Sequence, residues 1–516
     1  MDTLNPTLVI PTLLSIVLAI SVAQQNSRVP AGTQLHIRLT SPVGSYASVR
    51  GSRVSAVLIA PVILDGDMML PAGSILDGTV KSVTRVGYGL RHETAAIDLN
   101  FDRITPPAGD PIPIAAQVTG VDNSRERVTR TGRIEGVRST GSISYRVSGY
   151  LRTMLLWDVH AELAEWIIRS TLMEIPEPEI YYPPGVEMTL QLSAPLWAPA
   201  PSPSLSYCPL TSGERADLMQ VVSELPSRTH APISGRPSDL TNILLIGDHD
   251  QIVSAFEAAG WMEPTPSSLR GRIGFIRAVA ELHGDEDAPM SLLLLNGAQP
   301  GLSWQKGFND VAKRHHIRMW KVGGTWNGKE LWIGAATHDI DFEYLRRGTT
   351  VSHRIAPDID EERDKVAYDL AFTTCGKILD WTERPSLPRS AHNATGDRIF
   401  TDGRIAVVEL NDCAEPRTGN EGVEFEPLPA HGSRRQRLAR REILSARNEL
   451  FRSNPYYRSF EAGRWIVESV RAHRRRTEAA GWINSSIPAH TMYWRSARQP
   501  QPGVAANTVE PPLQQK

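Results

Sequence analysis

The sequence predicts a multidomain α+β protein: a small N-terminal β-barrel or β-sandwich module, followed by an α/β domain with a mixed sheet. Three observations indicate this fold class. At 516 residues the chain is long enough for roughly two to four domains. Its first part carries short alternating strands between Pro/Gly turns. After a proline-rich stretch, the pattern changes to continuous apolar strands and amphipathic helices.

The composition is that of a folded protein without a strong charge bias. Hydrophobic residues make up 41% of the chain, charged residues 22%, and the formal net charge is −2. A chain so close to neutrality has no global positive field, which argues against nucleic acid as a partner. Beyond the N-terminus no segment approaches the roughly 18 consecutive apolar residues of a membrane span, which argues against a multi-pass membrane protein.

The first 23 residues predict a signal peptide or an N-terminal membrane anchor. Residues 8–22 form an uncharged, mostly apolar run that is too short to cross a bilayer comfortably. The run ends in Ser21-Val22-Ala23, a small-x-small pattern typical of signal peptidase cleavage, although Asp2 stands where a basic residue is expected. We therefore expect an exported protein of the periplasm or cell envelope, with a retained anchor or neither as the alternatives.

Residues 29–196 predict the β-rich module. Residues 29–39 contain a Pro-x-Gly turn followed by apolar Leu35, Ile37 and Leu39 at a period of two. Short strands of this kind at regular spacing favour a barrel or sandwich. Similar units occur at residues 53–62, 70–80 and 96–104.

An internal repeat ties the two ends of this module together. Residues 29–43 align without gaps to residues 182–196, which predicts that a late strand returns to the same sheet. Between them, residues 159–173 predict an inserted helix. The module resembles the "VPAG" β-modules common in exported bacterial proteins, and that resemblance implies no particular chemistry.

Residues 197–239 are expected to form a linker because prolines cluster at their start. The α/β domain is then predicted over residues 240–412. Continuous apolar runs are typical of strands that are buried on both faces. The expected strands are residues 240–247, 290–295 and 405–410, and the expected helices are residues 248–260, 269–283 and 360–374.

The chain has three cysteines, Cys208, Cys375 and Cys413. In an exported protein they allow one disulfide, and Cys375 with Cys413 is the favoured pair because both follow the linker. Three small buried hydrophobic residues are the alternative. Residues 427–516 predict a basic, partly helical or disordered tail, which either contacts an anionic membrane surface or is simply solvated.

Three polar blocks between residues 314 and 364 contain the candidate site. Cores rarely accept unpaired His, Arg or Asp, because desolvating them costs several kcal/mol each. The blocks therefore indicate either a ligand pocket or a buried polar network. The candidate pocket residues are His315, His316, Arg318, Trp320, Trp332, Thr337, Asp339, His353, Asp360, Glu362, Arg363 and Asp364.

Asn327-Gly328 predicts a two-residue hairpin turn in the middle of these blocks. With this turn, one face of the hairpin becomes a shallow shelf with a His–Asp pair at one end and an Arg in the middle. Gly323-Gly324 is the weak point, since a bulge there would shift the register by one. The opposed pairs expected on the shelf are His316–Asp339, Arg318–Thr337 and Trp320–Ala335.

The sequence leaves the chemistry of the blocks open. In a functional interpretation, His316, Asp339, His353 and Asp360 bind a divalent metal or act as acid and base. In a structural interpretation, the acids after Asp358 cap a helix, because Asp358 with Glu361 resembles a capping box. No phosphate loop, HExxH or GxSxG motif occurs, so no enzyme class is predicted, and a divalent metal is the cofactor that the sequence leaves open.

Five motifs occur in order over about residues 240–410. They are residues 242–261, Arg314-His315-His316-x-Arg318-x-Trp320, Trp332-x-Gly334-Ala335-Ala336-Thr337-x-Asp339, Ile355-x-Pro357-x-Ile359-Asp360-x-Glu362-Arg363-Asp364 and Thr401-Asp402-Gly403-Arg404. Together these motifs resemble the LssY C-terminal domain family. Members are bacterial and are labelled putative type I secretion components. Many join this domain to membrane-embedded segments that resemble phosphatidic acid phosphatases or DedA proteins, which this chain lacks.

Two functional hypotheses follow. The first is a binding or secretion-associated assembly module of the cell envelope, in which the shelf holds an anionic ligand or an envelope protein and Arg318 supplies the charge. The second is a metal-dependent hydrolase acting on a phosphorylated or glycan envelope substrate through the four candidate metal ligands.

Overall fold

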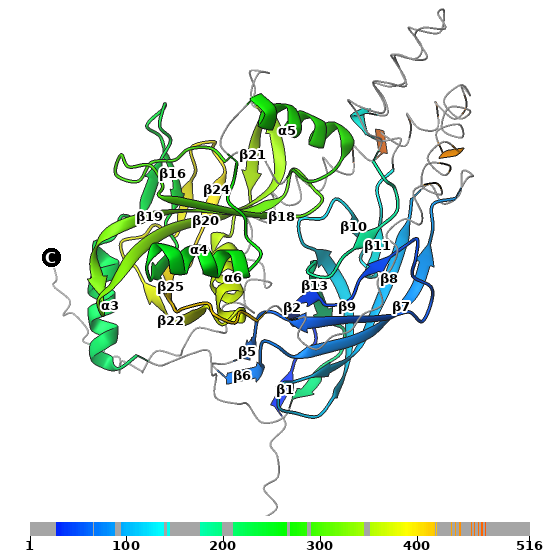
Figure 1. Ribbon diagram of the computed structural model, residues 1–516, viewed down its shortest axis with the longest axis horizontal. Helices are drawn as coiled ribbons and strands as arrows, with labels where there is room; N and C mark the ends of the chain where they lie inside the picture. Colours follow the sequence, from blue (N-terminus) through cyan, green and yellow to red (C-terminus); the bar gives the residue numbers. More distant parts are fainter. Residues whose placement is uncertain are drawn as a thin grey trace, which may run out of the picture.

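The computed structural model contains two β-rich domains, a barrel in blue and cyan and a larger domain in green and yellow (Figure 1). The predicted multidomain α+β fold is confirmed. The signal segment, the helix expected over residues 159–173 and most of the basic tail lie outside the described residues. The structure describes residues 27–64, 67–87, 94–138, 142–144, 176–198, 210–265, 269–285, 290–344, 351–417 and 419, with isolated positions between 435 and 470.

The N-terminal domain is a closed barrel, so of the two expected forms the barrel is the one that occurs. Six strands follow one another in the order β8–β7–β4–β2–β13–β9, and β9 pairs with β8 to close the ring. Alternate side chains point inward, and most of them are buried, as the period-two pattern predicts. The strands are β2 (Gln34–Leu39), β4 (Arg53–Leu58), β7 (Ile75–Thr84), β8 (Ala96–Thr105), β9 (Ile112–Val121) and β13 (Glu187–Leu192).

The internal repeat places β13 antiparallel beside β2, so the late strand does return to the same sheet. In each copy the glycine of the Pro-x-Gly turn has a positive φ, 90° at Gly32 and 96° at Gly185, which glycine adopts without steric cost. Short strand pairs surround the barrel: β1 (Ser27–Val29) with β14 (Leu196–Ala198), β3 (Val43–Gly44) with β12 (Tyr181–Tyr182), β5 (Val62–Leu64) with β6 (Asp67–Leu70), and β10 (Arg127–Val128) with β11 (Arg133–Glu135).

The second domain is built on a mixed sheet in the order β18–β19–β20–β17–β25–β22, with β21 beside β20. Only β17 and β25 pair in parallel among these strands. All four residues of β17 are completely buried, because both faces of the sheet are covered. The strands are β17 (Ile243–Ile246), β18 (Leu302–Gly307), β19 (Arg314–Trp326), β20 (Lys329–Tyr344), β21 (Val351–Ile355), β22 (Gly376–Glu383) and β25 (Arg404–Leu410).

Helices cover the two faces of this sheet. On one face, α4 (His249–Ala258) and α6 (Ile359–Phe372) pack against side chains of β19 and β20. On the other face lies α3 (Ser212–Glu224). The predicted start and stop of α4 are both present: Asp248 caps its N-terminus, and Gly260 follows its end with a φ of 79°. The predicted helix over residues 269–283 is α5 (Leu269–Glu281).

Two expected segments differ from the prediction. The second half of the expected linker is structured, with α3, β15 (Arg228–His230) and β16 (Pro237–Leu240). Residues 290–295 form isolated bridges instead of a strand, Leu294 with His230 and Leu295 with Ala298. Leu293 and Leu295 are nevertheless buried, and an apolar run alone cannot distinguish a buried strand from a buried loop. A last hairpin consists of β23 (Ser390–His392) and β24 (Arg398–Phe400).

Cys375 and Cys413 form a disulfide, which is the favoured pairing. The bond joins the end of α6 to the segment after β25 and closes a loop of 38 residues that contains β22 to β25. Cys208 lies outside the described residues.

We expect Cys413→Ser to lower the free energy of unfolding by about 3–4 kcal/mol, because the unfolded chain regains the entropy of this loop. Urea denaturation of the oxidised proteins measures the loss. Dithiothreitol should lower the stability of the wild type to that of the variant and leave the variant unchanged. A variant that matches the oxidised wild type would contradict the expectation.

Every helix within the described residues is too short or too polar to reach from one side of a lipid bilayer to the other.

Candidate functional site

The β19–β20 hairpin turns where the sequence predicts, with Trp326 paired to Lys329 around Asn327-Gly328. A bulge at Gly323-Gly324 then shifts the register by two residues instead of one. Because the shift is an even number, every side chain keeps its predicted face of the sheet. The opposed pairs are Arg314–Asp339, His316–Thr337, Arg318–Ala335 and Trp320–Ile333, so the expected pairs His316–Asp339, Arg318–Thr337 and Trp320–Ala335 are wrong.

Asp339 lies at the centre of a buried cluster on the predicted shelf face. Its Oδ1 is 3.0 Å from Nε2 of His316, and its Oδ2 is 3.1 Å from Nε of Arg314 and 3.4 Å from Nδ1 of His353. Burial opposes ionisation, but His316, His353 and Arg314 outweigh it and hold the pKa of Asp339 well below its usual range. The carboxylate therefore stays charged and is shared by three basic side chains.

The four expected metal ligands do not form one site. His316, Asp339 and His353 are neighbours, but the guanidinium of Arg314 contacts the same Asp339 oxygen that faces His353. A fixed positive charge at that position opposes a divalent ion. Asp360 belongs to a different cluster, described below.

Thr337 is fully buried beside His316. Its Oγ1 lies 3.2 Å from Nδ1 and 3.4 Å from Nε2 of the imidazole. The hydroxyl is therefore within hydrogen-bonding distance of the imidazole and belongs to the same buried cluster.

The expected open shelf is covered. Arg318 is only 4% exposed, because residues 290–295 lie over it. Its Nε and Nη2 donate to the carbonyl and hydroxyl oxygens of Ser291 at 2.9 and 3.0 Å, and Nη1 is 3.5 Å from Asp239. Trp320 donates from Nε1 to the carbonyl of Ala298 at 3.1 Å and packs in the core with α3. The shelf is thus part of the domain interior.

Trp332 lies on the opposite face from Trp320. It packs in the hydrophobic core formed with α4 and α6, and its ring centroid is 6.3 Å from that of His249 at the start of α4. Its role in the described structure is to fill this core.

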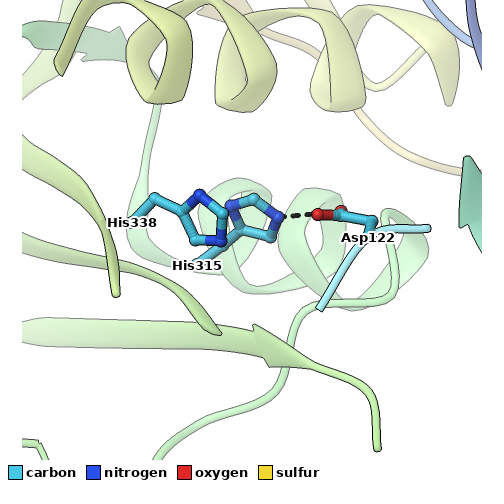
Figure 2. Close-up of side chains that lie close together, drawn as sticks. All are labelled: Asp122, His315 and His338. Carbon is cyan, nitrogen blue, oxygen red and sulfur yellow. Dashed lines mark hydrogen bonds and ion pairs between the residues drawn. The ribbon is translucent and has the colours of Figure 1, made fainter. Parts of the chain in front are cut away.

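His315 also points to this second face, where the domain meets the barrel (Figure 2). Its Nδ1 is 2.6 Å from Oε2 of Glu362 on α6, and its Nε2 is 2.8 Å from Oδ2 of Asp122, which follows β9 of the barrel. Burial favours the neutral ring, but Asp122 and Glu362 outweigh it and raise the pKa of His315 to about 9. The imidazolium joins one carboxylate from each domain.

His338 stacks on His315, with ring centroids 4.2 Å apart and planes tilted by 23°. Its Nε2 is 2.9 Å from Oδ1 of Asn123. Burial, together with the charge on His315, lowers the pKa of His338 to about 3, so this ring is neutral. Across the described ranges, the place where three metal-ligating groups come within 4.8 Å of one another is Asp122, His315 and His338.

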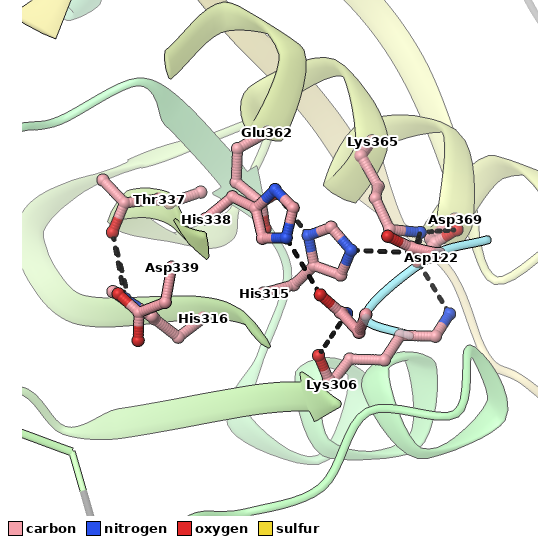
Figure 3. A network of polar contacts seen from close by, with 12 residues as sticks. Asp122, Lys306, His315, His316, Thr337, His338, Asp339, Glu362, Lys365 and Asp369 are labelled. Carbon is pink, nitrogen blue, oxygen red and sulfur yellow. Dashed lines mark hydrogen bonds and ion pairs between the residues drawn. The ribbon is translucent and has the colours of Figure 1, made fainter. Parts of the chain in front are cut away.

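Buried ion pairs continue from His315 across the domain junction (Figure 3). Glu187 on β13 accepts from Arg38 at 2.8 Å, from Lys306 at 2.7 Å and from Lys365 at 2.6 Å. Asp369 on α6 accepts from Lys306 and Lys365 at 3.0 and 3.2 Å. Burial disfavours ionisation of Glu187, yet the three cations hold its pKa well below its usual range.

We call this group the interdomain charge network. Its four cationic and four anionic side chains balance, as expected when charges are removed from water. None of its barrel residues was predicted as functional. Arg38 and Glu187 are direct cross-strand partners, so an opposite-charge pair would have been recognisable once β2 and β13 were aligned. The members are Arg38, Asp122, Glu187, Lys306, His315, Glu362, Lys365 and Asp369.

Arg363 is the centre of a third cluster. Its Nη1 is 3.2 Å from Asp360 and 2.9 Å from Asp402, and its Nε is 2.7 Å from Asp364. Thr401 Oγ1 also donates to Asp360 at 2.8 Å. The cluster connects the first turns of α6 to the turn before β25, and it accounts for Asp360, Arg363 and Asp364 of one sequence motif and Thr401 and Asp402 of the other.

The structural interpretation of Asp358 is correct in part. Asp358 is the N-cap of α6, and its side chain accepts from the backbone N–H of Asp360 at 3.1 Å. The expected capping box with Glu361 does not form.

Comparisons with known proteins agree with the sequence motifs. No curated protein matches the chain. Among solved structures, ComB10 of the Com type IV secretion system of Helicobacter pylori matches at 13% identity over 35% of this chain and 94% of that chain, with a TM-score of 0.20. A TM-score that low supports no conclusion about fold or function. Residues 222–405 match the family described as LssY C-terminus, which is the family that the sequence motifs resemble.

Proposed function

We propose that this protein is an exported cell-envelope binding protein, a secretion-associated assembly module in which the barrel and the LssY C-terminus domain act as one platform. The observation that carries the proposal is the internal pairing of the polar blocks. Their charged groups bind one another or the barrel, and Arg318 and Asp339 are 4% and 2% exposed. Side chains used in this way stabilise a scaffold and are not presented to a substrate.

The disulfide between Cys375 and Cys413 supports an exported location. Disulfides persist in the periplasm and at cell surfaces, whereas cytosolic thiols are kept reduced. The apolar N-terminal run that ends in Ser21-Val22-Ala23 supports the same location.

Exposed apolar side chains supply a surface for a partner. Ile273 and Ile276 on α5 are 54% and 63% exposed, and they lie one helical turn apart on the same face of the helix. Exposed apolar groups of this kind are typical of protein-binding sites. In the basic tail, Ile466, Val467 and Val470 are exposed as well, which fits contact with an envelope protein or an anionic membrane surface.

Site-specific photo-cross-linking in a bacterial host tests the proposal. A photoreactive residue at position 276 should yield a cross-linked species in the periplasmic or envelope fraction. The same residue at position 250 should not, because Asp250 is an exposed polar position on α4. An added Ile273→Ser substitution should weaken the cross-link at 276.

Thiol labelling of the same fractions tests the location. Cys375 and Cys413 should resist alkylation until a reductant is added. Alkylation of Cys375 and Cys413 without reductant, in a cytoplasmic fraction, or equal cross-linking at positions 276 and 250, would overturn the proposal.

The arrangement does not favour the metal-dependent hydrolase built on His316, Asp339, His353 and Asp360. Asp360 is held by Arg363, and Arg314 competes for Asp339.

A further inference from the structure

We propose that Asp122, His315 and His338 bind a divalent transition metal, best suited to zinc, at the junction of the two domains. This metal site is distinct from the polar cluster around Asp339 and goes beyond the binding function proposed above. It would join the barrel, which supplies Asp122, to the LssY C-terminus domain, which supplies both histidines.

The positions of the donors carry the proposal. His315 and His338 are direct partners in the β19–β20 ladder, so the fold itself places two imidazoles side by side. The segment after β9 brings the carboxylate of Asp122 to Nε2 of His315 at 2.8 Å (Figure 2). One donor atom from each residue lies within 4.8 Å of the other two. Donors that share a tetrahedral zinc ion are about 3.4 Å apart, so adjustments of about 1 Å would bring them together.

The surroundings of His315 are those of a metal-binding histidine. Glu362 holds Nδ1 at 2.6 Å, which fixes the ring and turns Nε2 toward Asp122. A carboxylate on the far nitrogen is the usual partner of a histidine that binds zinc. The second oxygen of Glu362, Oε1, is buried and has no hydrogen-bond partner among the described residues, so this carboxylate is only partly satisfied by protein donors.

A proton now takes the place that the ion would occupy. Without a metal, His315 must carry protons on both nitrogens to bind Glu362 and Asp122 at once. Metal binding would displace the proton on Nε2, so one proton leaves for each ion bound and the affinity rises with pH.

Metal binding requires one rearrangement and is opposed by one nearby positive charge. The stacked rings of His315 and His338 cannot both direct a lone pair at one ion, so the His338 ring must turn away from Asn123. Lys365 is 4.0 Å from Asp122 and opposes a cation, although its pairing with Glu187 and Asp369 reduces this repulsion.

Metal titration of the full, chelator-treated chain tests the site. We expect one zinc ion per chain by calorimetry, with about one proton released, and one cobalt ion with the visible absorption of a tetrahedral site. His338→Ala and Asp122→Asn should each weaken binding at least tenfold. His249→Ala is the matched control, because this histidine is exposed on α4, and it should bind as the wild type does.

Asn123→Ala keeps the test valid if a ligand variant fails to fold. It removes no proposed ligand; it removes the hydrogen bond to His338 and the one that Asn123 Nδ2 donates to the carbonyl oxygen of Lys306 at 3.1 Å. Losing an orienting partner typically changes affinity by about 10- to 100-fold, so a change of that size in either direction supports the site. Failure of the wild type to bind zinc or cobalt, or unchanged affinity in all three variants near the site, would overturn the proposal.

Discussion

Glu187→Ala is expected to lower the free energy of unfolding by about 3–5 kcal/mol. The carboxylate accepts from Arg38, Lys306 and Lys365 inside the domain junction, and its loss leaves three buried cations with fewer partners. Removing one member of a buried ion network is costly because the remaining charges stay out of water. Urea denaturation at pH 7 followed by circular dichroism measures the change.

Glu135→Ala provides the matched control. Glu135 pairs with Arg127 on the barrel surface, where both side chains are substantially exposed. Such a pair contributes about 0–1 kcal/mol, so the control should unfold almost as the wild type does. Equal effects of the two substitutions would contradict a buried, stabilising network.

The network also predicts that the protein loses stability as the pH falls below about 4.5. Because the folded-state pKa of Glu187 lies well below the ordinary value of 4.5, its contribution is complete above pH 4.5 and is lost as the pH falls toward the folded-state value. Glu187→Gln should remove this part of the acid sensitivity.

Arg363→Met is expected to have the second large effect, again about 3–5 kcal/mol at pH 8. The guanidinium is the common partner of Asp360, Asp364 and Asp402, and methionine leaves three carboxylates buried near one another. Burial, with Asp402 and Asp364 nearby, already raises the pKa of Asp360 to about 7. The defect should therefore shrink between pH 8 and pH 5.5, because protonation relieves the uncompensated charge.

Arg404→Met is the control for this prediction. Its guanidinium contacts Glu383, whose side chain is 45% exposed, at 3.4 Å. The expected loss is below about 1 kcal/mol and independent of pH over the same range. If Arg363→Met were no more destabilising than Arg404→Met at pH 8, the cluster would not stabilise the start of α6.

Features that depend on neighbouring residues could be predicted from the sequence. Asp248 and Gly260 mark the two ends of α4, because a capping carboxylate and a left-handed glycine act within one turn of the helix. The Asn327-Gly328 turn is equally local. The repeat that contains Gly32 and Gly185 predicted the pairing of two strands that are distant in the sequence, since each copy of the turn leads into one of two adjacent strands.

Features that depend on distant parts of the chain could not be predicted from the sequence. The bulge at Gly323-Gly324 changed every opposed pair on the far side of the bulge from the turn. Its size depends on backbone torsions such as the φ of 90° at Gly324. The partner of His315 is 193 residues away in another domain. The shelf around Arg318 was expected to be open, because nothing in the local sequence says that Ser291 lies over it.

The distribution of charge across the junction has a consequence for the integrity of the molecule. The barrel contributes one cation and two anions, while the other domain contributes three cations and two anions, so the two halves attract each other. If a protease cut the chain between residues 198 and 210, the two fragments should therefore remain associated. The ion pairs between the domains would hold them together without the peptide connection.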